Sequence, residues 1–392
     1  MFDFDKPINR ENTFSVKWDN RTEVFGTNDV YPLWVADMDF EAPKEVTDAI
    51  LKRAEHRVYG YSLHADAYFN AFISWSQRKH NWEVQREWCF FSPGIVPALA
   101  VAVQTFTGEW DKVLVQSPVY NPFFDVVEGN KRELVHSPLI LKNGRYHMDY
   151  ESLEKEFAGG VKLMLLCNPH NPGGRVWSKE ELTRLAELSL KYEVVVFSDE
   201  IHCDLVYPNQ KHTPYLSLGE KYLPFSAVSQ SPSKTFNIAG LSSSVVVIAD
   251  KEMRDRMKNL METIHLCMGN IFGTEAFKTA YTLCDSWHSE LISYLEMNLK
   301  LATSFIQNQL PVIKVMQPDA GFLLWLDFSD LGLSDKMLNE FLVTKAGLGL
   351  SAGVMYGHEG SGFMRLNFGL NRAQLEKCLI RLQQAVNSLP VR

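Results

Sequence analysis

Residues 161–167 read VKLMLLC and residues 194–200 read VVVFSDE, and these two stretches decide the fold class. Both contain near-continuous apolar runs rather than an alternation of apolar and polar residues. Such runs are typical of parallel strands that are buried on both faces of a sheet. Between them, Ser178 and Glu181 have the spacing of a capping box, which predicts a helix that ends at Tyr192. Strand, helix and strand in this order predict a parallel βαβ unit.

The same alternation continues on both sides of this unit. Apolar residues at helical spacing predict a helix over 44–57, and further strands are predicted at 112–116, 225–229 and 245–248. We therefore expect an α/β fold with a mostly parallel central sheet sandwiched by helices.

The last third of the chain has a different pattern, which predicts a smaller α+β lobe. Helices are expected over 288–309, 335–345 and 372–388, and strands over 322–328 and 363–368. We place an N-terminal segment at 1–44, packed with the small domain, a large ligand-binding domain at 45–280 and a small C-terminal domain at 281–392.

Composition excludes several classes of protein. The 392 residues are 46% hydrophobic and 22% charged, which is ordinary for a folded domain and not for a disordered chain. The formal net charge of −8 argues against a nucleic-acid partner. The N-terminus has no signal-peptide features, and no apolar stretch is long enough to span a membrane. Six cysteines without close pairs and eleven histidines without ligand spacing predict no metal site and a reducing, cytoplasmic location.

Polar residues follow four of the predicted strands at the point where each strand ends. These segments are 117–120, 168–174, 198–200 and 231–234. Because the carboxyl ends of parallel strands share one edge of the sheet, ligands bind there. Four polar segments at that edge predict a binding site.

Asp199 directly follows a buried strand, so its carboxylate needs a cation nearby. The cation could be an Arg or Lys of the protein, or a protonated pyridine nitrogen of a ligand. Residues 94–96 open a helix with a glycine, which leaves backbone N–H groups free for an anion. Lys234 alone could equally be a solvated surface charge.

Taken together, these groups make a coherent site. They comprise an anion cradle at Gly94–Val96 with Ser231, an aromatic face at Tyr120, an amide at Asn171, a carboxylate at Asp199 and an amine at Lys234. Pyridoxal 5′-phosphate (PLP) needs this set of groups. Lys234 would bind the aldehyde, and Asp199 would keep the ring nitrogen protonated.

The order Tyr120, Asn171, Asp199, Ser231-x-x-Lys234 and Arg365 resembles that of fold-type I PLP enzymes in the class I/II aminotransferase superfamily, over nearly the whole chain. The resemblance implies the PLP-dependent transferase-like fold. Five stretches are similar to the branch of bacterial cystathionine β-lyases and C–S lyases: WVADMDF at 34–40, VYGY at 58–61, NPHNPGGRVW at 168–177, SDEIH at 198–202 and SKTFNIAG at 233–240.

The resemblance also implies roles for individual residues. Lys234 would be the catalytic Schiff-base lysine, and Arg365 would clamp the substrate α-carboxylate, with contacts from Ala36 and Asn171. Tyr61 would reach the cofactor of a neighbouring subunit, which implies a homodimer with shared active sites. The other cofactor-binding residues would be Ile95, Val96, Ser231 and Ser233 at the phosphate, Tyr120 stacked on the ring, Asn171 at the ring hydroxyl, Asp199 at the ring nitrogen, and His202.

Two positions depart from the aminotransferase pattern. His202 stands where many members have a tyrosine, and Ser242 stands where many have an arginine that grips the phosphate. Both departures fit the lyase branch.

The activity expected from the resemblance is β-elimination from L-cystathionine, L-cysteine or other S-substituted cysteines, giving a thiol, pyruvate and ammonia. Transamination with an oxo acid would use the same residues and is the main alternative. Ser231-Pro-Ser-Lys234 also matches the S-x-x-K motif of serine hydrolases, but no separate K-T-G strand follows. A PLP-binding regulator without catalysis is the non-enzyme alternative.

Overall fold

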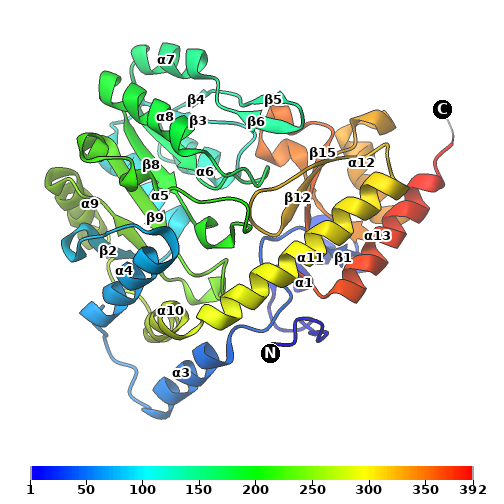
Figure 1. The fold of residues 1–392 in the computed structure, drawn as a ribbon, viewed down its shortest axis with the longest axis horizontal. Helices are drawn as coiled ribbons and strands as arrows, with labels where there is room; N and C mark the ends of the chain where they lie inside the picture. Colours follow the sequence, from blue (N-terminus) through cyan, green and yellow to red (C-terminus); the bar gives the residue numbers. More distant parts are fainter. Residues whose placement is uncertain (1, 391–392) are drawn as a thin grey trace.

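A seven-stranded central sheet covered by helices on both faces forms the larger part of the computed structural model, which describes residues 2–390 (Figure 1). The strand order is β2-β10-β9-β8-β7-β3-β4, and β10 runs antiparallel to both of its neighbours. The predicted mostly parallel sheet is confirmed. The strands are β2 Cys89–Ser92, β3 Lys112–Val115, β4 Glu133–His136, β7 Val161–Cys167, β8 Val195–Asp199, β9 Ser226–Gln230 and β10 Ser244–Val247.

The continuous apolar run of β7 is explained by the two cores that flank the sheet. Leu163 and Leu165 pack into the core on one face, whereas Met164 and Leu166 pack into the core on the other. Successive side chains of a strand point to opposite faces, so a strand between two cores needs apolar residues at every position.

Helices α5, α6 and α9 cover one face, and α4, α7, α8 and α10 cover the other. The predicted capping box is present, because the Ser178 side chain accepts from the Glu181 N–H and the Glu181 side chain accepts from the Ser178 N–H. The helices of this part of the chain are α3 Lys44–Glu55, α4 Asp66–His80, α5 Ile95–Phe106, α6 Pro122–Glu128, α7 Tyr150–Ala158, α8 Lys179–Tyr192, α9 Lys251–Thr263 and α10 Ile271–Leu283.

The C-terminal part forms a second sheet in the antiparallel order β11-β12-β15-β14. Its strands are β11 Lys314–Met316, β12 Leu323–Asp327, β14 Ser351–Ala352 and β15 Phe363–Asn367, and its helices are α11 Asp285–Gln309, α12 Asp335–Phe341 and α13 Arg372–Asn387. The helix predicted to reach residue 345 ends at Phe341 and continues as a π-helical turn over Leu342–Ala346. None of the helices within residues 2–390 is long and apolar enough to cross a membrane.

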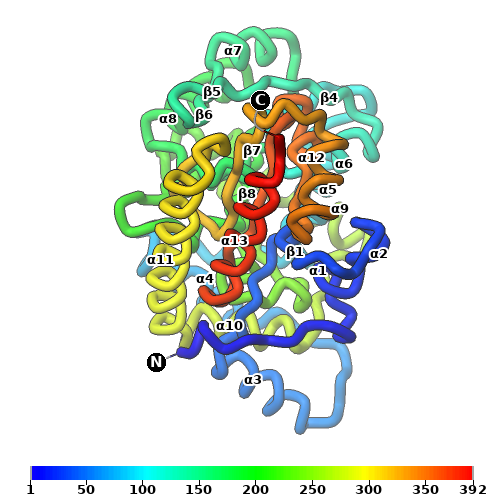
Figure 2. Tube along the Cα trace, turned by 90° about the vertical axis from the view of Figure 1, so that its right-hand side faces the viewer, coloured from blue at the N-terminus to red at the C-terminus, as the bar shows by residue number. Residues whose placement is uncertain are grey.

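The N-terminal segment runs beside the C-terminal part of the chain, as the blue and the orange-to-red segments of Figure 2 show. Its short strand β1, Tyr31–Pro32, pairs in parallel with β13, Leu348–Gly349. The Leu33 carbonyl oxygen accepts from the Asn367 N–H at 2.9 Å. The domain boundaries near residues 44 and 280 stay a prediction.

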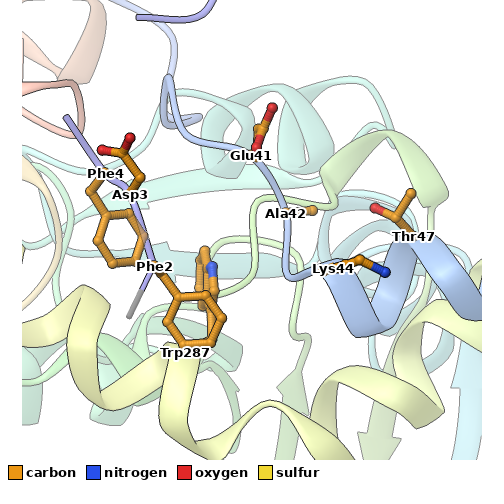
Figure 3. A pocket seen from close by; sticks show the side chains of 8 residues that line it. All are labelled: Phe2, Asp3, Phe4, Glu41, Ala42, Lys44, Thr47 and Trp287. Atoms are coloured by element: carbon orange, nitrogen blue, oxygen red, sulfur yellow. The ribbon is translucent and has the colours of Figure 1, made fainter. Parts of the chain in front are cut away.

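Aromatic packing fixes the start of the chain. The Phe4 ring lies 5.2 Å from Phe40, 5.6 Å from Trp287 and 5.3 Å from Tyr294, measured between ring centroids. Beside this cluster is a cavity of about 460 Å³ (Figure 3). None of the residues predicted to bind a ligand lines it; the lining residues are Phe2, Asp3, Phe4, Glu41, Ala42, Lys44, Thr47 and Trp287.

Asp319 joins the C-terminal part of the chain to the central sheet. Its buried carboxylate accepts two hydrogen bonds from the Arg145 guanidinium, at 3.0 and 2.7 Å, and one from the Val176 N–H at 3.0 Å. The backbone N–H groups of Asp319 and Ala320 both donate to the Gly174 carbonyl oxygen. This loop therefore fixes the segment that follows Asn171.

We predict that Asp319→Ala lowers the free energy of unfolding by about 2 kcal/mol, because Arg145 and a buried backbone N–H lose their acceptor. The midpoint of urea unfolding measures the change. Asp330→Ala is the matched control, since its pair with Lys314 lies on the surface. Equal effects of the two substitutions would contradict the assignment.

Candidate active site

Strand register brings three of the predicted segments together at the carboxyl edge of the sheet. Cys167 of β7 pairs with Asp199 of β8, and Asp199 pairs with Ser229 of β9. The loops that carry Asn171 and Lys234 therefore begin on either side of Asp199.

Asp199 is buried without a cationic partner from the protein. Its side chain is 5% exposed, and its Oδ1 accepts a hydrogen bond from the Ile201 N–H at 3.0 Å. Burial raises the pKa of the carboxyl group to about 7, although this N–H and the Lys234 charge act in the opposite direction. Within residues 2–390 no Arg or Lys forms an ion pair with it, so a cation bound at this carboxylate would favour its ionised form near neutral pH.

The Lys234 amine interacts electrostatically with Asp199. Its Nζ donates to the Ala36 carbonyl oxygen at 2.6 Å. Burial and the Arg365 charge lower the pKa of Lys234 to about 8, although Asp37 and Asp199 act in the opposite direction. A lysine with a lowered pKa is suited to act as a nucleophile and a base near neutral pH.

The serine-hydrolase interpretation is not supported by the contacts of Ser231. Its Oγ donates to the Ser243 carbonyl oxygen at 2.8 Å and accepts from the Ser233 N–H at 3.2 Å. The Lys234 amine instead bonds to Ala36, so Lys234 does not activate the Ser231 hydroxyl in this arrangement.

Arg365 of β15 is buried and lacks a carboxylate partner among the described residues. Its Nη1 donates to Asn171 Oδ1 at 3.1 Å and its Nη2 donates to the Trp34 carbonyl oxygen at 2.6 Å. Its Nε has no hydrogen-bond partner, and the guanidinium lies 5.1 Å from the Tyr356 ring centroid. A buried guanidinium with only neutral partners can bind an anion such as a carboxylate.

The start of α5 provides an anion cradle. Gly94 is the N-cap and no side chain caps this helix. Pro97 has no N–H, and the Ala98 N–H donates to the Gly94 carbonyl oxygen. The N–H groups of Ile95 and Val96 are therefore the first-turn donors left for an anion.

Ser231 and Ser233 lie near this helix start because of the sheet register. Ser244 at the start of β10 pairs with Ser92, which immediately precedes the α5 turn. Ser231 bonds to the neighbouring Ser243. The helix start at 94–96 and the segment at 231–233, which are both predicted to bind the phosphate, thus lie on either side of the start of β10.

Tyr120 and His202 also lie among these groups. The Tyr120 N–H donates to the Asn171 carbonyl oxygen at 3.1 Å, and burial raises the pKa of its phenol, which is also influenced by Arg365 and Asp199. His202 is buried and its Nδ1 has no partner. Burial lowers the pKa of His202 to about 3, so its ring is neutral.

Tyr61 is the predicted site residue that lies apart from the rest. It belongs to the loop between α3 and α4, and its side chain is 97% exposed. Val58, Tyr59 and Leu63 in the same loop are exposed as well.

Two amides that hold the N-terminal segment in the site were missed by sequence reasoning. Asn237 donates to the carbonyl oxygens of Met38 and Phe40, both at 2.8 Å. Asn367 donates to those of Val35 and Asp37, at 2.7 and 2.6 Å. Asn237 follows Lys234 by three residues and Asn367 follows Arg365 by two. This closeness in sequence to predicted site residues could have indicated that both asparagines belong to the site.

Folding also brings three possible metal ligands together that sequence spacing did not indicate. Ligand atoms of His80, Cys203 and Asp204 lie within 4.8 Å of one another, and all three residues are buried. Asp204 Oδ1 already accepts from the Trp75 indole and from His80 Nε2, both at 2.8 Å. We interpret the group as a hydrogen-bonded network of the core.

Comparison with known proteins gives full-length similarities. Residues 28–382 match the family model described as aminotransferase class I and II. The chain is 45% identical over 385 residues to cystathionine beta-lyase PatB of Bacillus subtilis, covering 98% of this chain and 100% of that protein.

Two solved structures extend this result. A PLP-bound protein from Clostridium difficile 630, provisionally described as an aminotransferase, has a TM-score of 0.97 and 41% identity, over 99% of this chain and 100% of that chain. Cystalysin from Treponema denticola, which contains PLP, has a TM-score of 0.96 and 33% identity over 100% of both chains.

The buried Asp199 predicts a pH-dependent cost to the cofactor-free protein. Its raised pKa means that the folded state retains a proton that the unfolded state loses above about pH 4, so stability falls as pH rises to about 7. An asparagine at this position does not ionise, so it does not lower the stability of the folded state as pH rises. We therefore expect the melting temperature of cofactor-free Asp199→Asn to exceed that of the wild type by roughly 2–6 °C at pH 8 and by less at pH 5. A difference that does not change with pH would contradict this assignment.

Proposed function

This chain belongs to the aminotransferase class I and II family, and from that premise we propose that it is a PLP-dependent carbon–sulfur β-lyase. It cleaves L-cystathionine by β-elimination to homocysteine, pyruvate and ammonia, and it also accepts L-cysteine or other S-substituted cysteines. The observation that carries the proposal is the Lys234 amine, which interacts electrostatically with both Asp199 and Arg365, in a chain 45% identical to cystathionine beta-lyase PatB.

The residues of the site fit PLP. The buried Asp199 lacks a cation, and the pyridine nitrogen of PLP supplies one when it is protonated. The free N–H groups of Ile95 and Val96 suit its phosphate, as do the side chains of Ser231 and Ser233. In addition, Tyr120 would face the ring, and Asn171 and His202 would lie near the ring hydroxyl.

The residues would act on the substrate in a defined order. Arg365 binds the substrate α-carboxylate and orients the Cα–H bond toward Lys234. The Lys234 Nζ, in its uncharged form, takes the Cα proton. Bound PLP supplies a ring that accepts the electron pair left on Cα. Asn171 holds Arg365 in place, because its Oδ1 accepts a hydrogen bond from that guanidinium. The Ala36 carbonyl oxygen holds Lys234 in the same way. The thiolate then departs from Cβ, and water hydrolyses the released three-carbon enamine to pyruvate and ammonia.

Transamination is the alternative that the same residues permit. In that reaction Lys234 returns the proton to the cofactor rather than allowing a group to leave from Cβ. The Clostridium difficile structure provisionally described as an aminotransferase favours keeping it as the second candidate.

We also propose that the active enzyme is a homodimer in the cytoplasm, with Tyr61 reaching the cofactor of the neighbouring subunit. The exposure of Tyr61, together with Val58, Tyr59 and Leu63, supports this arrangement, because a contiguous apolar loop of this kind is typical of an interface. All six cysteines are free, which supports a reducing compartment.

Pyruvate release tests the lyase activity directly. PLP-loaded protein mixed with L-cystathionine, without an oxo acid, should release pyruvate continuously. Lys234→Ala should lower the rate by at least ~10³-fold, because it removes the base, whereas the exposed-lysine control Lys221→Ala should not change it. Turnover that requires an added oxo acid would contradict the lyase activity and support transamination.

The dimer proposal predicts that Tyr61→Phe weakens PLP binding by roughly tenfold, through loss of one hydrogen bond to the phosphate. Fluorescence titration of cofactor-free protein measures the affinity, with Tyr59→Phe as the control from the same loop. Light scattering should give twice the 44.8 kDa chain mass. A monomer, or an affinity unchanged by Tyr61→Phe, would be evidence against shared sites.

A further inference from the structure

Glu200, the residue after Asp199, is fully buried, and both of its carboxylate oxygens accept several hydrogen bonds. Oε1 accepts from Tyr215 N at 2.8 Å, Ser198 Oγ at 3.0 Å and Asn168 Nδ2 at 3.4 Å, and Oε2 accepts from Gln230 Nε2 at 2.8 Å and His212 Nε2 at 3.0 Å. A carboxylate can accept from all five donors, whereas an amide side chain has a single acceptor oxygen.

Three of these donors come from three neighbouring strands of the central sheet. Asn168 immediately follows β7, Ser198 lies in β8 and Gln230 ends β9. Each donor lies within four residues of a predicted site residue: Asn168 precedes Asn171, Ser198 precedes Asp199 and Gln230 precedes Lys234. One carboxylate therefore ties together the beginnings of the three loops that carry the ring-binding groups and the amine.

Burying a second carboxylate next to Asp199 is electrostatically unfavourable, which indicates that the Glu200 carboxylate has a structural role. Glu200 directly follows Asp199 in the sequence, and its charge adds to burial in raising the pKa of Asp199. Because its oxygens are already engaged by protein donors, Glu200 does not depend on a ligand for its hydrogen bonds.

We propose that Glu200 is a positioning residue for the reaction, which fixes the spacing of Asn171, Asp199 and Lys234 by joining the ends of β7, β8 and β9. The proposal rests on the proposed function, in that these three residues hold PLP. Glu200 acts through the loops and not by contact with the substrate.

The test uses Glu200→Gln, which preserves the shape of the side chain and directs an amide NH₂ group at donors that need an acceptor. We expect kcat for pyruvate release to fall by about 10–100-fold with KM changed less than about threefold, as is typical when supporting residues of a site shift by a fraction of an ångström. The PLP dissociation constant should rise by about tenfold, and the pH midpoint of the visible absorbance of bound PLP should move by about half a unit or more.

Asp204→Asn is the matched control. Asp204 is an equally buried carboxylate four residues along, and it bonds to Trp75 and His80 rather than to strand ends. It should lower thermal stability to a similar extent while leaving kcat and the pH midpoint of absorbance near wild type. If Glu200→Gln retains wild-type kcat and spectrum, or if Asp204→Asn changes them equally, the positioning role is wrong.

Gln230→Met provides a second test if Glu200→Gln does not fold. It removes only the link from β9, so we expect a smaller drop in kcat, of roughly 2–10-fold, with a smaller change of the cofactor spectrum in the same direction. An unchanged spectrum in a folded Gln230→Met protein would overturn the proposal.

The cofactor titrations separate this proposal from the proposed function. They require no lyase activity, so wild-type protein that binds PLP but releases no pyruvate would contradict the lyase assignment alone. Unchanged PLP affinity and spectrum in Glu200→Gln, beside an active wild type, would contradict the positioning role alone.

Discussion

The buried carboxylate of Asp199 is the constraint on which the site depends. It lies at the end of a strand that is covered by helices on both faces. The Ile201 N–H donates to it, and it forms no ion pair within the described residues. A charge in such a place lowers the stability of the fold unless an opposite charge is brought to it. The buried carboxylate thus lowers the stability of the cofactor-free protein and raises its affinity for a cationic ring. The same burial lowers the pKa of Lys234, so one physical effect prepares both groups.

Much of this could be predicted from the sequence, because buried parallel strands leave a strong pattern. The run over 161–167 and the capping residue Ser178 both correspond to elements with the expected bounds. Once the strands were placed, the polar residues after them had to share one edge of the sheet. Asn171, Asp199 and Lys234 were predicted as site residues by this reasoning together with the family resemblance.

The remainder of the site depends on backbone atoms and on contacts between distant parts of the chain. The carbonyl oxygens of Trp34 and Ala36 bond to Arg365 and Lys234, yet carbonyl oxygens occur in every residue and leave no signal in a sequence. The grouping of His80 with Asp204 joins residues 124 apart, and helical or strand periodicity carries no information about it. The antiparallel direction of β10 was likewise not specified by its apolar run.

The path of the N-terminal segment has a consequence for the order in which the enzyme is made. The N-terminal segment is synthesised before its partners in the C-terminal part of the chain, and β1 can pair with β13 only after Leu348 and Gly349 have been synthesised. Asn367, which holds the carbonyl oxygens on both sides of Ala36, is made later still. The carbonyl oxygen that accepts from Lys234 is therefore held on both sides by a residue of β15, which is synthesised after every strand of the central sheet. A chain that stops short of β15 would contain every loop of the central sheet and still lack the Asn367 hydrogen bonds on both sides of Ala36.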